Sequence, residues 1–298
     1  RKDKEITPAV YEFTEGWIKS EAGQNSSYRP LLEQILKNNE ETLKGVSFFG
    51  VRGDSDSNID ALGRFYQFSD GSSGIAVSPS RRKFLEAKKD PETTFLHETL
   101  HAITAVKIEE VFQLDRIKSA LGPDADNREI FFEQLKRIES IAKNKNVEES
   151  YRGIASTYIK AVMGNTGYKN VADVDIDKLF DDIANRAGDS RNRVGLTNLH
   201  EFVVETISNP KFFQEIDGGI NPAHRGVFRQ MLHWIGQLVG VKENLSGDFG
   251  TIVRNSLSIA RSQEADVVSG AYKTGNFNRM DDLTLNDRSD DLSFDGTL

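Results

Sequence analysis

Two histidines lie four residues apart in the sequence HETLH, at His97 and His101, and Glu98 follows the first of them. On an α-helix, residues i and i+4 project from one face a turn apart, so both imidazoles can bind a single zinc ion. Glu98 can then take a proton from a water at the open position of the metal. Asp90-Pro91, ahead of the motif, is typical of a helix start. The alternative is a pair of ordinary histidines on a core helix.

A catalytic zinc ion needs a third protein ligand besides two histidines. A second helix-like stretch carries Glu201 and Glu205 four residues apart among apolar side chains. Carboxylates on an apolar helix need partners, and a metal ion for Glu201 and a histidine N–H for Glu205 would satisfy both. We therefore predict one Zn²⁺ bound by His97, His101 and Glu201. Two alternatives stay open: His200 as the third ligand, or an exposed glutamate pair.

The composition excludes several classes of function. The 298-residue chain has no cysteine, which removes disulfides, thiolate ligands and cysteine nucleophiles. Its net charge of −8 argues against a surface built to bind nucleic acid. No apolar run reaches the roughly 18 residues of a membrane span, and no signal peptide follows the basic start. We expect a protein or peptide partner, with no nucleic acid and no membrane span.

The hydrophobic pattern predicts the elements that must position these residues. Residues 46–51 read as a strand, and 63–68 and 75–78 as a hairpin joined by a loop rich in glycine, serine and aspartate. Pro79 ends the second hairpin strand or places it at a sheet edge, where an extended peptide could add as a strand. Long helical stretches are predicted at 104–121, 127–163 and 226–262. The predicted fold class is α+β, predominantly helical, with a small antiparallel sheet or hairpin packed on the zinc-binding helix.

The HETLH motif followed by Glu-x-x-x-Glu at 201–205 resembles the gluzincin type of zinc metallopeptidase. Three longer stretches are similar to metallopeptidase domains embedded in large bacteriophage polyvalent and virion-associated proteins, and distantly to the catalytic domain of anthrax lethal factor. These stretches are GRFYQF…GIAVSP…TTFLHETLHAIT, GLTNLHEFVVETISNPKFFQEI and FRQMLHWIGQLVGVKE. In such peptidases the first glutamate of the second motif is the third ligand, and the acid one turn later hydrogen-bonds a zinc-bound histidine. The resemblance implies a zincin-like fold.

The function that this resemblance implies is that of a zinc-dependent endopeptidase with one Zn²⁺ per chain, within a larger phage or mobile-element protein. Its substrate would be a protein or peptide, and its partners would include other virion proteins. The expected location is the phage virion, or the host cytoplasm after delivery. The alternative is a structural virion or ejection component whose metallopeptidase-like domain packs or binds instead of catalysing.

One position departs from the family pattern. Relatives of this type can carry a tyrosine shortly before the second motif, where it stabilises the oxyanion, and no tyrosine stands there in this sequence. The residues that could substitute for it are His200, His224, Tyr151, Tyr158 and Tyr168.

The predicted domain organisation has three parts. Residues 1–44 form an N-terminal helical arm, and residues 45–267 form the zincin-like metallopeptidase domain with a helical insertion at about 105–190. Residues 268–298 are polar and acidic and cannot build a core, so we expect a flexible tail. Because the chain starts at Arg1 without an initiator Met, we expect a processed product, an excised domain or a recombinant truncation.

Overall fold

The computed structural model describes eight stretches of the chain. These are residues 8–50, 63–68, 70–77, 91–164, 170–186, 190–219, 225–241 and 249–257. The predicted acidic tail, 268–298, lies outside the described residues, as does Pro79. No helix among the described residues is long and apolar enough to cross a membrane.

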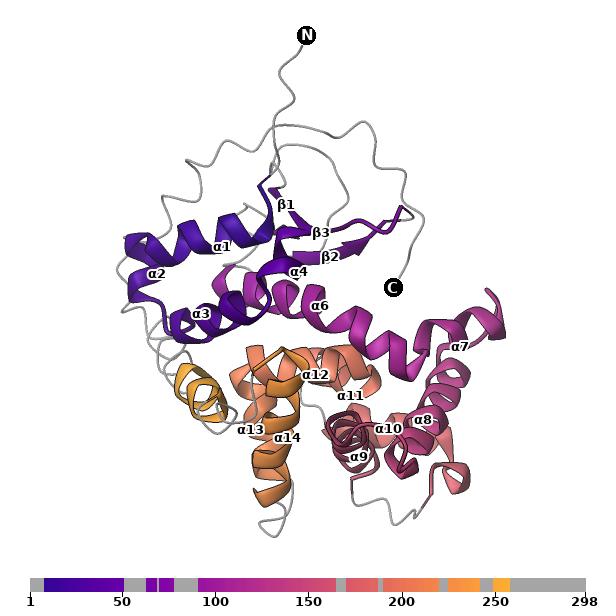
Figure 1. Ribbon diagram of the computed structural model, residues 1–298. Helices are drawn as coiled ribbons and strands as arrows, with labels where there is room; N and C mark the ends of the chain where they lie inside the picture. The colour runs from indigo at the N-terminus through magenta and orange to yellow at the C-terminus, as the bar shows by residue number, and fades with distance from the viewer. Residues whose placement is uncertain are drawn as a thin grey trace.

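A three-stranded mixed sheet forms one layer of the molecule (Figure 1). Its strands are β1 (Val46–Gly50), β2 (Gly63–Gln67) and β3 (Ser73–Val77), in the order β1-β3-β2. β2 and β3 form the predicted antiparallel hairpin, whereas β1 pairs with β3 in parallel. The predicted hairpin is confirmed, whereas the sheet as a whole is mixed rather than antiparallel, because the pattern of each strand carries no information on its neighbours.

The hairpin strand predicted to lie at an edge is in fact the centre of the sheet. β3 is flanked by β1 on one side and by β2 on the other, and its residues 74–77 are buried. Among the described strands, β2 is the edge next to the predicted motif helix. The hairpin turn is held by the Phe68 N–H, which donates to the Ser72 carbonyl at 2.8 Å, and by Gly71 at a φ of 83° that favours glycine.

The predicted motif helix is α6 (Pro91–Phe112), which begins at the proline that the sequence indicated. It packs on β2 and β3 with one side and on helix α12 with the other (Figure 1). Such a helix must be apolar nearly all round, and Phe95, Leu96, Leu100 and Ile103 are buried accordingly. Several of its polar side chains, Glu98 among them, are therefore placed in the interior, where each needs a partner.

Four N-terminal helices pack beside the sheet and the start of α6. They are α1 (Val10–Lys19), α2 (Glu21–Asn25), α3 (Arg29–Asn38) and α4 (Glu40–Lys44). The ring of Phe13 stacks on Phe48 of β1 at 3.9 Å and meets Phe95 of α6 edge-on at 5.1 Å. The Ser26 hydroxyl also donates to Glu92 at 2.6 Å. This part of the chain shares one hydrophobic core with the sheet and α6.

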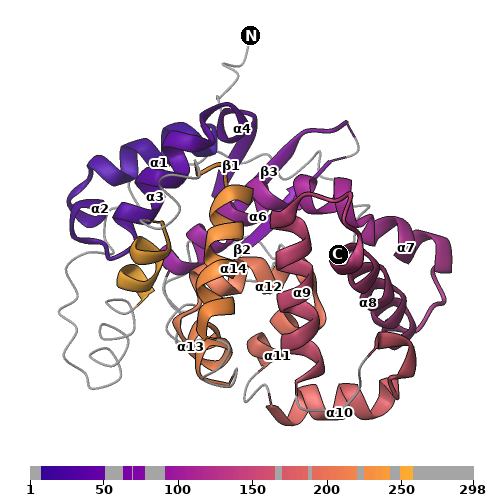
Figure 2. The same ribbon diagram turned by 60° about the horizontal axis from the view of Figure 1, so that its bottom comes forward.

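The remaining helices form a second layer on the other side of α6 (Figures 1 and 2). They are α7 (Leu114–Leu121), α8 (Asn127–Lys143), α9 (Glu149–Met163), the short 3₁₀ helix η1 (Val171–Asp173), α10 (Ile176–Arg186), α11 (Ser190–Thr197), α12 (Leu199–Ser208), α13 (Pro210–Gly219), α14 (Arg225–Leu238) and the helical residues 249–257. α9 packs between α8 and α14, and α12 lies directly against α6.

Each of the three long predicted helices is interrupted. The first breaks at Gln113, whose φ is 56°, and the side chain of Glu109 accepts from the first two backbone N–H groups of α7, each at 3.0 Å. The second breaks after Lys143, where Asn144 begins a turn. The third breaks at Gly240, whose φ is 81° and which lies against the Asn38 carbonyl.

Candidate metal centre

Helix α12 supplies the second half of the predicted site, and its start is fixed by a side-chain cap. The Asn198 side chain accepts from the backbone N–H groups of His200 at 2.8 Å and Glu201 at 3.3 Å. Such caps satisfy the first donors of a helix, which otherwise lack partners. Phe202 and Val203 behind them are fully buried. The cap and the core together direct Glu201 toward α6.

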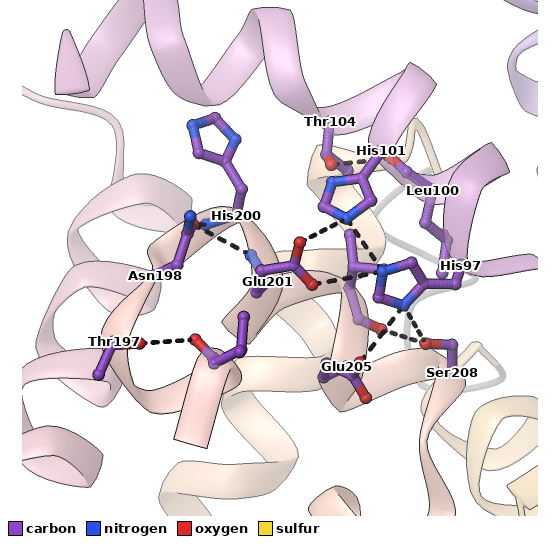
Figure 3. Close-up of polar contacts among 12 residues, drawn as sticks. His97, Leu100, His101, Thr104, Thr197, Asn198, His200, Glu201, Glu205 and Ser208 are labelled. Atoms are coloured by element: carbon purple, nitrogen blue, oxygen red, sulfur yellow. Dashed lines mark hydrogen bonds and ion pairs between the residues drawn. The ribbon is translucent and has the colours of Figure 1, made fainter. Parts of the chain in front are cut away.

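The structure brings His97, His101 and Glu201 together, close enough to hold a metal ion. The Nε2 atoms of His97 and His101 lie 3.1 Å apart, and each is 3.3 Å from an oxygen of Glu201 (Figure 3). A zinc ion bound at about 2.0–2.2 Å in tetrahedral geometry holds its ligand atoms about 3.3–3.6 Å apart. The three side chains fit a zinc ion in their types, and one ligand atom from each lies within 4.8 Å of the other two. No other group of this kind occurs in the stretches that the structure describes.

The three groups also match one another electrostatically. Burial alone would raise the pKa of Glu201, but hydrogen bonds from His101 and His97 outweigh it and hold that pKa well below the ordinary value. Burial lowers the pKa of His97, while Glu201, Glu98 and Glu205 raise it and prevail. A buried carboxylate facing two imidazoles is a region of negative potential, which suits a cation.

Glu205 lies one turn along α12 from Glu201, beneath His97. Its Oε1 is 3.6 Å from His97 Nδ1, and only 3% of the residue is exposed. The alternative of an exposed glutamate pair is therefore wrong for Glu205. A residue that the sequence analysis missed, Ser208, lies at the same imidazole nitrogen, with its Oγ 3.3 Å from Nδ1. The available signal was its spacing, since residues at i, i+4 and i+7 share one helix face.

Glu98 points to the sheet side of α6. It is 7% exposed, and its carboxylate lies against Gly63 of β2, where an added Cβ would stand 2.9 Å from Oε1. The backbone N–H of Phe65, on the same strand, hydrogen-bonds this carboxylate. Burial raises the pKa of Glu98 above its ordinary value, and the neighbouring His97 and His101 oppose the rise. A carboxylate whose pKa is moved toward neutrality is a better proton acceptor.

His200 is beside the three-residue group but is directed away from it. Its imidazole projects toward α6, where Nε2 lies 4.0 Å from Glu109 (Figure 3). Burial, together with the nearby His101, lowers the pKa of His200 to about 4, so the ring is neutral at pH 7. The structure places Glu201, not His200, among the candidate ligands.

Of the other residues considered for oxyanion stabilisation, the two that the structure describes, Tyr151 and Tyr158, are not gathered here. The buried hydroxyl of Tyr158 donates to the Leu196 carbonyl at 3.1 Å, and burial raises its pKa. Tyr151 packs against Phe112, eleven residues from His101 and so about 16 Å along α6. Tyr168 and His224 lie outside the described residues.

Comparisons of the chain with protein-family models, with curated proteins and with solved structures give no match. The geometry of the site and the motifs that form it therefore carry the functional argument.

Proposed function

We propose that this chain is a zinc-dependent endopeptidase of zincin-like organisation, with the metal held by His97, His101 and Glu201. The observation that carries the proposal is the meeting of three potential ligands: the Nε2 atoms of His97 and His101 lie 3.1 Å apart, and the two oxygens of Glu201 lie 3.3 Å from one imidazole each. Glu98, adjacent to the first ligand and with a raised pKa, supports hydrolysis rather than a purely structural metal.

A bound zinc ion would supply a Lewis acid and lower the pKa of a coordinated water to about 7. Glu98 would accept the proton of the attacking water and pass it to the leaving amine. Glu201, as a carboxylate, would complete the ligand set, and Glu205 would hold the ring of His97 through its Nδ1 hydrogen. Among the oxyanion candidates within the described residues, His200 lies beside the group but points away from it, toward Glu109, so we assign this role to none of them.

Among the described strands β2 is an edge of the sheet, and we propose that an extended peptide substrate docks there. The Phe68 N–H donates to the Ser72 carbonyl across the hairpin. Because hydrogen-bonded residues alternate along an antiparallel strand, the backbone N–H and C=O groups of Tyr66 and Arg64 also point toward β3. The backbone groups of residues 63, 65 and 67 then face away from β3, and the Phe65 N–H among them already hydrogen-bonds Glu98. An edge of this kind can pair with an added strand, and Glu98 lies beside it.

The biological setting is proposed from the resemblance alone. We propose that the domain is part of a larger phage or mobile-element protein and acts in the virion or in the host cytoplasm after delivery. Virion proteins would then be its substrates or partners. If the domain bound zinc but cleaved nothing, the structural virion or ejection component would be the better account.

Replacing Glu98 by Gln tests catalysis separately from metal binding. The amide is nearly isosteric but cannot accept a proton, so Glu98→Gln should keep one zinc and lose about 10²–10⁴-fold in cleavage rate. The matched control is Glu110→Gln, which changes an exposed glutamate on the same helix. Cleavage is measured on an unfolded labelled protein and on a random peptide library.

Wild-type protein and Glu110→Gln should cleave equally. Equal cleavage by Glu98→Gln would contradict the assignment of the base. A zinc-loaded wild type that cleaves none of these substrates would contradict the proposed peptidase and favour the structural alternative.

A further inference from the structure

We propose that Ser208 is a positioning residue for the metal site, and that it fixes the ring of His97 by accepting the hydrogen on Nδ1. The inference rests on the proposed metal site and does not depend on which bond the enzyme cleaves. Ser208 is the last residue of α12 and is 1% exposed, with its Oγ 3.3 Å from His97 Nδ1.

The direction of this hydrogen bond follows from a second hydrogen bond that the Ser208 hydroxyl makes. Ser208 Oγ donates its only hydrogen to the Val204 carbonyl, one turn earlier on α12, at 2.9 Å. A hydroxyl whose hydrogen is already donated can only accept from a further neighbour. The lone pairs of Oγ therefore face the imidazole, and Nδ1 must be the donor.

The Glu205 carboxylate is a second hydrogen-bond acceptor at His97 Nδ1. Glu205 Oε1 lies 3.6 Å away, and an ionised carboxylate is an acceptor only. Its other oxygen, Oε2, is buried without a hydrogen-bond partner, so Glu205 has acceptor capacity to spare. Two acceptors at Nδ1 keep a hydrogen on that nitrogen, so Nε2, which hydrogen-bonds Glu201 when no metal is bound, is the nitrogen that can release its hydrogen and bind an ion.

A hydrogen held on Nδ1 is what a metal ligand at Nε2 needs. His97 Nε2 faces His101 Nε2 at 3.1 Å and Glu201 at 3.3 Å, so once its hydrogen is released its lone pair is directed to the position of the ion. In the other tautomer Nε2 would carry a hydrogen and could not bind. Ser208, as the closer of the two acceptors, therefore restricts both the tautomer and the rotation of the ring.

The test compares zinc affinity in Ser208→Ala and in a matched control, Thr206→Val. The Thr206 hydroxyl is also buried on α12 and bonds the carbonyl one turn earlier, at Phe202, without a recorded contact to His97. We expect Ser208→Ala to weaken zinc binding about 10-fold, at the lower end of the effect of losing a partner of a metal-bound histidine. Thr206→Val should leave the affinity unchanged, and Ser208→Thr, which keeps a hydroxyl, should restore it.

The measurement is competition with a chelator on the full chain, accompanied by thermal unfolding and by ¹⁵N NMR of the His97 ring with zinc bound. The NMR signal of the Nδ1–H tautomer should weaken in Ser208→Ala and persist in Thr206→Val. Unchanged zinc affinity in Ser208→Ala would overturn the inference, as would an equal loss in Thr206→Val. A wild type that binds no zinc would overturn the proposed metal site itself. Failure of the site and failure of the Ser208 role therefore give different results.

Discussion

At the scale of single residues, the acidic side chains of α12 differ in what they contact. Glu201 faces two imidazole Nε2 atoms at 3.3 Å, whereas Glu205 faces the opposite nitrogen of His97 and keeps one oxygen unpaired. A buried charge with few partners is costly, so its retention needs a compensating interaction. A cation bound at Nε2 of His97, as we propose, would polarise that ring and so supply this interaction for Glu205.

Replacing Glu205 should therefore affect zinc affinity without removing a ligand. Glu205→Ala is expected to weaken zinc binding about 10–100-fold. Glu205→Gln, whose amide oxygen still accepts from Nδ1, should have a mild effect. Chelator competition gives both affinities, and thermal unfolding shows whether the Ala variant stays folded. Wild-type zinc affinity in a folded Glu205→Ala would contradict the role of this residue.

The sequence indicated several residues of the site, and the reason is their chemistry. His97, Glu98 and His101 form a pattern that rarely arises by chance, and Glu201 carries a charge on an otherwise apolar helix. Ser208 gave no such signal, because a serine at the end of a helix is common and its hydroxyl usually bonds its own backbone. Only the packing of α12 against α6 shows that this hydroxyl also reaches His97.

At the scale of elements, the contact of β2 with α6 sets the position of Glu98. A Cβ added at Gly63 would stand 2.5 Å from Thr94 Cγ2 and 2.9 Å from both Cγ and Oε1 of Glu98. These separations are too short for any side chain. Glycine at this position therefore lets the edge strand approach the helix, and the edge of the sheet reaches the proposed base.

Gly63→Ala should displace Glu98 or push β2 away from α6. We expect zinc binding to persist, because Gly63 touches no proposed ligand, while turnover falls at least about 10-fold, since small displacements of a reacting group are costly. Overpacking should also lower the free energy of unfolding by about 1–3 kcal/mol. Gly16→Ala, in the exposed middle of α1 with open space around it, is the control and should keep full turnover. Wild-type turnover in Gly63→Ala would contradict this account.

The sequence predicted the elements more reliably than their arrangement. The start of α6 and the β2–β3 hairpin were confirmed, because Pro91 and the glycine-rich turn are local signals. The order of strands was not predictable, since the pairing of β1 with β3 joins segments more than twenty residues apart. The break at Gln113 was hidden because a glutamine with φ of 56° is held there by tertiary contacts, among them the cap from Glu109.

At the scale of the whole molecule, α6 lies between the sheet with its N-terminal helices and the second helical layer (Figure 1). The side chains of His97 and His101 are each only 12% exposed as a result, and that of Glu201 is 26% exposed. The sequence showed an apolar helix bearing polar residues, but it did not show that α12 would cover them. This burial brings three polar side chains together in a group that could hold a metal ion.

The most direct test of the account is the zinc content of the purified chain, measured by elemental analysis together with circular dichroism. We predict about one zinc per wild-type chain, and far less in both His101→Ala and Glu201→Ala, with the helical spectrum retained. Glu110→Gln should bind zinc like the wild type. A wild-type chain without zinc after incubation with the metal, or full occupancy in Glu201→Ala, would contradict the three-residue site.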